Sequence, residues 1–87
     1  MNIVNQIKRF LLRALLRLEG LPWPTALLDQ AAQRAVLPQP LLSEVHQATR
    51  ELERDGFIIG QRDDLDGEIT WSLTPKGQHK AAQLPEP

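Results

Sequence analysis

The 87-residue sequence contains no cysteine, which excludes disulfide bonds and zinc sites built on thiolates. Its two histidines, His46 and His79, lie too far apart along the chain to form a local pair of metal ligands. We therefore expect neither a metal nor a cofactor. The sequence also offers no nucleophile, base and orienting acid that can be assembled into a catalytic site, which predicts that the protein is not an enzyme.

Long apolar runs are also missing. Lys8, Arg9, Arg13 and Arg17 interrupt the apolar N-terminal segment, so neither a secretory signal nor a membrane span fits, and we expect a cytoplasmic protein with no membrane partner.

The sequence has no excess of basic residues. Its formal net charge is −1, whereas nucleic-acid-binding domains are usually basic. The charge is unevenly distributed, because residues 1–18 hold four bases and no acid, while residues 63–68 hold four acids and no base. We therefore expect a domain with a basic end and an acidic loop.

Length predicts a single domain over residues 1–83, followed by a flexible, proline-containing tail at 84–87. Apolar periodicity predicts a first helix that ends before Gly20 and buries one broad face. Leu12 and Leu16 form a second apolar strip beside that face. Because a helix in a small core presents one side to it, we expect these two leucines to form a homodimer interface.

Two further helices are expected between proline-containing breaks. The second begins near Thr25 and stops at Leu37–Pro38. Its apolar positions are Ala26, Leu27, Leu28, Ala31 and Ala35. The third runs over residues 41–55, with Gly56 as its left-handed cap, and its apolar face comprises Leu42, Val45, Ala48, Thr49 and Leu52.

A β-hairpin and a short helix complete the chain. Residues 57–62 and 68–73 form two strands around the turn at 63–67, with Trp71 on the inward side as a core anchor. Thr74 then caps a helix that has Pro75 at its first position and reaches about residue 83. The expected fold class is α+β, mostly α: three helices, a hairpin and a short C-terminal helix.

Two sequence signatures resemble bacterial winged helix-turn-helix regulators. Leu52-Glu53-Arg54-Asp55-Gly56-Phe57-Ile58 resembles the junction between the recognition helix and the wing, and Leu73-Thr74-Pro75-Lys76-Gly77 resembles the segment that closes the wing in MarR-like and PadR-like transcription factors. Together with the acidic turn between them, they stand in the order and at the spacing that a hairpin requires. The resemblance covers roughly residues 25–80.

The resemblance implies a small transcription regulator of bacterial or phage origin that binds double-stranded DNA. Its third helix would enter the major groove while the hairpin lies along the backbone. The candidate DNA contacts are Ser43, His46, Gln47, Arg50 and Arg54 on the third helix, Arg62 on the wing, and Arg9 and Arg13 on the first helix.

The same residues have an alternative interpretation. Winged helices also serve as protein-interaction modules, and the acidic turn at 63–67 stands where MarR-like wings carry an arginine. Arg50 and Arg54 also suit a solvated face on which they pair with neighbouring glutamates. The alternative function is therefore an adaptor that binds another protein and no DNA, and convergence of the basic residues on one surface would favour DNA.

Overall fold

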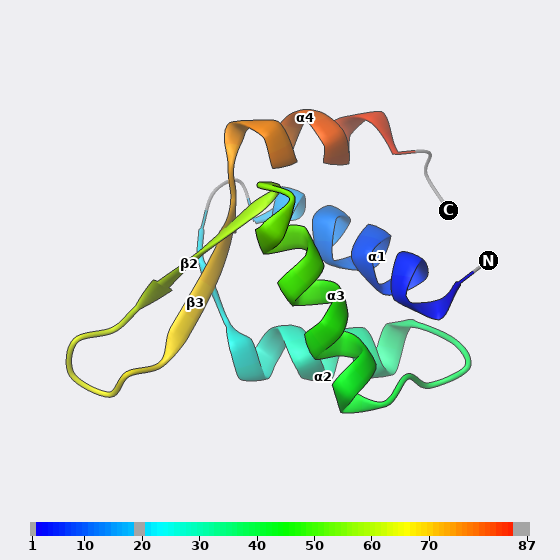
Figure 1. Ribbon diagram of the computed structural model, residues 1–87, viewed down its shortest axis with the longest axis horizontal. Helices are drawn as coiled ribbons and strands as arrows, with labels where there is room; N and C mark the ends of the chain where they lie inside the picture. The colour runs from blue at the N-terminus through cyan, green and yellow to red at the C-terminus, as the bar shows by residue number, and fades with distance from the viewer. Residues whose placement is uncertain (1, 19–20, 85–87) are drawn as a thin grey trace.

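A computed structural model describes residues 2–18 and 21–84 (Figure 1). The helices are α1 (Ile3–Arg17), α2 (Thr25–Ala35), α3 (Leu42–Arg54) and α4 (Pro75–Gln83). The strands are β1 (Trp23–Pro24), β2 (Ile58–Arg62) and β3 (Ile69–Leu73). The predicted class and the predicted order of three helices, hairpin and C-terminal helix are confirmed. Among the described residues, no helix is long and apolar enough to cross a membrane.

Two predicted boundaries fall partly outside the described residues. Gly20, the expected stop of the first helix, is not described, and neither are residues 85–87 of the expected tail. Leu84, the first residue of that tail, is half-buried and packs against the core.

Helix α1 contributes more buried residues to the core than any other described element. It packs against α2, α3 and α4 together, so several sides of it are covered (Figure 1). Ile7, Leu11 and Leu15 are fully buried, and Leu12 is only 4% exposed. The prediction that Leu12 lies outside the core, on an apolar strip that contacts a second copy, is therefore wrong, because α3 and α4 cover that side of the helix. Leu16 is half-buried beside α4.

The helical phase of α2 also differs from the prediction. Leu28 and Ala32 are its buried residues, whereas Leu27 is exposed. A short helix rich in alanine has apolar residues on several sides, so periodicity alone does not select the buried one. In α3 the predicted face is buried at Val45, Ala48, Thr49 and Leu52, while Leu42, in the first turn, is exposed.

The hairpin belongs to a three-stranded antiparallel sheet in the order β1–β3–β2. Gly56 has the expected positive φ of 81° at the end of α3, and the Thr74 hydroxyl accepts a hydrogen bond from the Gly77 N–H at 3.0 Å, as predicted for a cap. Trp71 is buried, as predicted. Strand β1 was not predicted, and in it Trp23 pairs with Trp71.

Candidate nucleic-acid interface

The polar face of α3 consists of residues that are spaced three or four positions apart along the helix. Ser43, Gln47, Arg50 and Arg54 are all exposed, and their spacing places them along one side of the helix. The opposite side is held in the core by Val45, Ala48 and Leu52, which fixes the direction of this polar face. The buried Thr49 hydroxyl donates to the Val45 carbonyl at 3.0 Å, so it remains satisfied inside the helix.

Most polar side chains on this face already have partners. The His46 Nε2 atom lies 2.9 Å from the Asp29 carboxylate of α2. The Gln47 amide donates to Glu51 at 2.9 Å, and Arg54 Nε donates to Asp55 at 3.1 Å. The pair with Asp55 raises the pKa of Arg54.

Arg50 differs from its neighbours on α3. Its side chain forms no ion pair or hydrogen bond within the part of the chain that the structure describes. It lies at an open groove of about 220 Å³ where α3 meets the start of α2 and strand β3. The other residues that line this groove are Thr25, His46, Thr49, Ile69 and Trp71. The guanidinium is therefore available to an external acceptor, beside a largely apolar surface.

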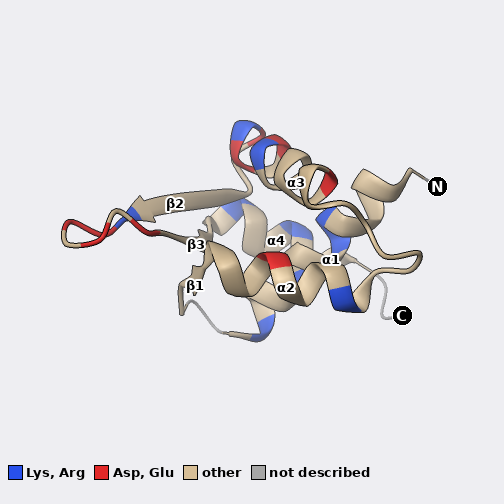
Figure 2. Ribbon diagram, turned by 90° about the horizontal axis from the view of Figure 1, so that it is seen from below, with Lys and Arg blue, Asp and Glu red and all other residues tan. Residues whose placement is uncertain are grey.

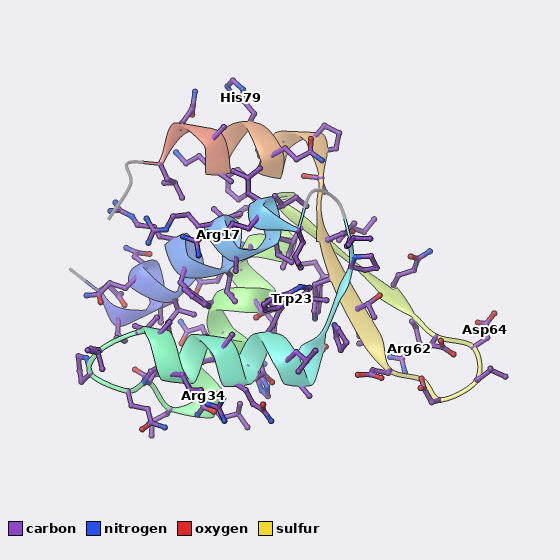
Figure 3. All side chains as sticks on the ribbon, turned by 180° about the vertical axis from the view of Figure 1, so that it is seen from behind. Arg17, Trp23, Arg34, Arg62, Asp64 and His79 are labelled. Carbon is purple, nitrogen blue, oxygen red and sulfur yellow. The ribbon has the colours of Figure 1, made fainter. Side chains whose placement is uncertain are left out.

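The basic residues of α1 do not extend this face as a block. Lys8 is paired with Glu51 of α3, and its hydrogen bond is the main reason why the pKa of Glu51 is lowered. Arg9 lines a groove bounded by α3 and α4. Arg13 and Arg17 line a different groove beside α4, and Figure 3 shows Arg17 on the side of α1 that faces α4. Lys8 and Arg9 therefore lie beside the C-terminal half of α3, whereas Arg13 and Arg17 lie beside α4, so the basic residues of α1 converge on α3 only in part.

The turn between β2 and β3, residues 63–67, extends away from the helices and is acidic (Figure 2). We call it the wing tip. The Asp63 and Asp66 carboxylates accept hydrogen bonds from the backbone N–H groups of Leu65 and Glu68 at 2.7 and 2.8 Å. Arg62 Nη1 lies 3.5 Å from the Gly67 carbonyl, so this predicted site residue points along its own hairpin.

Sequence reasoning missed the groove beside Arg50 and the partners of the site residues. Asp29 and Thr25 come from α2, far from α3 and β3 along the chain, and no local pattern marks them. Lys76 and Lys80 of α4 were missed as well. Lys76 donates to the Asp55 carbonyl at 2.7 Å and lies 4.8 Å from the centre of the Phe57 ring.

Three helices followed by a β-hairpin and a closing helix define a winged-helix-like fold, with α3 as its third helix and β2–β3 as its wing. No family model, no curated protein and no solved structure matches this chain. The fold assignment therefore rests on the order of the elements and on the pairing of the strands.

Proposed function

We propose that this protein binds double-stranded DNA and regulates transcription, with α3 in the major groove. The observation that carries the proposal is Arg50, an exposed guanidinium without an ion pair among the described residues, on the exposed side of α3. An arginine in this position can donate two hydrogen bonds to O6 and N7 of guanine. Gln47, one turn earlier on the same face, suits adenine.

The ion pairs on this face are weak obstacles to binding. The Arg54 and Asp55 side chains are well exposed, and exposed pairs of this kind typically contribute only about 0–1 kcal/mol. A phosphate or a guanine can therefore replace Asp55 as the partner of Arg54. Ser43, in the first turn of α3, is exposed for a further hydrogen bond.

The wing tip limits the mode of binding. Two like charges 4 Å apart repel by about 1 kcal/mol in water, so the exposed carboxylates of Asp63, Asp64 and Asp66 oppose approach to the phosphate backbone. We expect recognition through α3, with the wing held away from the DNA.

The test is a competition assay between selected and scrambled duplexes. Arg50→Ala should remove roughly 1–3 kcal/mol of discrimination at one base pair, because only a base contact carries sequence information. Arg34→Ala is the matched control, since Arg34 is also exposed. It lies roughly 14 Å along α2 from Thr25, the residue of α2 that lines the groove beside Arg50. Circular dichroism should show both variants folded.

The outcome of the same assay also separates DNA binding from the second candidate function, a protein-binding adaptor. The observation that favours an adaptor is the wing tip itself, where Leu65 is 98% exposed among carboxylates. If the wild-type protein shows no preference among duplexes and binds none more tightly than about 10⁻⁴ M at physiological salt, the DNA proposal is wrong and the adaptor replaces it.

A further inference from the structure

A groove of about 200 Å³ lies between α1, the C-terminal end of α3 and α4. We call it the α1–α4 groove. Its apolar lining is formed by Leu12, Leu52, Phe57 and Leu84. An apolar cavity of about 150 Å³ can hold a benzene molecule, so this groove is large enough for one aliphatic side chain.

The rim of the α1–α4 groove is positively charged. Arg9 and Lys80 are exposed and form no ion pair within the described part of the chain. The other two charged residues of the rim are already occupied, since Lys8 is paired with Glu51 and Asp55 is paired with Arg54. The groove therefore suits a ligand with an apolar centre flanked by negative charge.

The wing tip has this composition. Leu65 is 98% exposed, the highest value among the large apolar residues that the structure describes as exposed. Asp63, Asp64 and Asp66 surround it in the sequence and are exposed as well. The Leu65 N–H donates to the Asp63 carboxylate at 2.7 Å, and the Gly67 N–H donates to the Asp63 carbonyl at 2.9 Å, so hydrogen bonds within the turn favour this conformation.

We propose that the wing tip of one copy of this protein docks into the α1–α4 groove of a second copy. Leu65 occupies the apolar lining, and the flanking carboxylates pair with Arg9 and Lys80. The wing tip lies at the end of the hairpin farthest from the helices (Figure 1), whereas the groove lies among α1, α3, α4 and Phe57, which precedes β2 at the base of the hairpin. The two surfaces therefore cannot meet within one chain, and they join different copies head to tail.

This interface is heterologous, because each copy contributes a different surface to its two neighbours. It predicts chains or rings that grow with concentration, in contrast to the closed dimer that a two-fold interface would give. Since the contact combines apolar burial with exposed charge pairs, salt should weaken it.

Sedimentation velocity tests the proposal. The average mass of the wild-type protein should rise with concentration at low salt and rise less at high salt. Leu65→Ser removes the docking side chain, and the double variant Arg9→Glu with Lys80→Glu reverses the rim, so each should weaken self-association at least tenfold. Leu37→Ser is the matched control, because Leu37 is 78% exposed but lies outside both surfaces, and it should associate like the wild type.

A mixture of the two variants gives the most specific result. Leu65→Ser keeps an intact groove and the rim variant keeps an intact wing tip, so an equimolar mixture should form dimers and nothing larger. Wild-type protein that stays monomeric at about 1 mM in low salt, a concentration at which even a weak complex forms, would overturn the proposal. Association that both variants retain, or a mixture that stays monomeric, would also overturn it.

The test is independent of the proposed DNA binding. Leu65→Ser should bind duplex DNA like the wild type, whereas Arg50→Ala should self-associate like the wild type. If one proposal fails, the variants still test the other proposal. Circular dichroism of each variant checks that the fold is kept.

Discussion

At the residue scale, Leu12 shows how a central helix differs from a helix at the surface. It belongs to the buried core and also lines the α1–α4 groove, together with Leu52 of α3 and Leu84. A helical wheel predicts one apolar face and treats the remaining leucines as available to a partner. That assumption fails in α1, because three other helices pack around it.

Replacing Leu12 with glutamate should therefore unfold the protein. Loss of a buried leucine typically costs about 2–5 kcal/mol, and burial of a charge adds to that loss. Small domains have a total stability of only about 5–15 kcal/mol. Urea denaturation followed by circular dichroism measures the effect.

The matched control for Leu12→Glu is Leu37→Glu. Leu37 is exposed, so this change should alter the free energy of unfolding by no more than about 0.5 kcal/mol. The contrary outcome is a wild-type protein that is a two-fold dimer and a Leu12→Glu variant that is a folded monomer. That result would contradict the buried position of Leu12 and restore the homodimer interface predicted from the sequence.

At the element scale, the parts of the fold that were predictable are those set by local signals. Gly56 ends α3 and Thr74 begins α4 through contacts within a few residues, and both can be read from the sequence. Strand β1 has only two residues, and its partner, β3, is distant along the chain. No local pattern distinguishes it from an extended proline-rich link.

The same distinction applies to the candidate site. Periodicity predicted which side of α3 carries Gln47, Arg50 and Arg54. It did not predict the pairs between His46 and Asp29 or between Lys8 and Glu51, because each pair joins helices that only the folded chain brings together.

Thr25 connects two elements through its hydroxyl group. The hydroxyl donates to the Ile69 carbonyl at 2.8 Å and accepts from Trp71 Nε1 at 2.9 Å, which joins the start of α2 to β3. Thr25→Val keeps a similar shape but leaves the buried indole N–H without this acceptor. We expect a loss of about 1–3 kcal/mol in the free energy of unfolding.

Thr70→Val is the control for Thr25→Val. The Thr70 hydroxyl donates to the Gln61 carbonyl at a longer distance of 3.4 Å in an exposed position, so loss of this hydrogen bond should change the free energy of unfolding by less than about 0.5 kcal/mol. Equal losses for the two variants in thermal or urea unfolding would show that the bond between Thr25 and Trp71 does not hold the sheet to α2.

At the scale of the whole molecule, charge is separated along its length. The wing tip, which carries Asp63, Asp64 and Asp66, extends away from the helices (Figure 2), while Arg9 and Lys80 line the α1–α4 groove. This separation explains how a chain with a net charge of −1 can present local positive surfaces. It also places three exposed carboxylates on the element that a winged helix would bring toward DNA.

Reversing the charge of the wing tip tests whether that element approaches DNA. Asp63→Lys with Asp64→Lys should strengthen nonspecific binding and steepen the log–log dependence on salt by up to about two units, because each new phosphate contact adds about one. A smaller gain is expected for Asp63→Asn with Asp64→Asn, which removes repulsion and adds no cation. Filter binding or fluorescence anisotropy over a range of salt concentrations measures both.

The control for net charge places the same change elsewhere on the molecule. Asp63→Asn with Asp64→Asn raises the net charge by 2, from −1 to +1, and so does Gln78→Lys with Ala82→Lys on the exposed side of α4. The α4 variant is compared with Asp63→Asn/Asp64→Asn. If both gain the same affinity for DNA, long-range attraction explains the gain, and the position of the wing does not. If neither wing variant changes the affinity or the salt dependence, the wing stays beyond a Debye length, about 8 Å at physiological salt, from the backbone, and α3 must bind DNA without it.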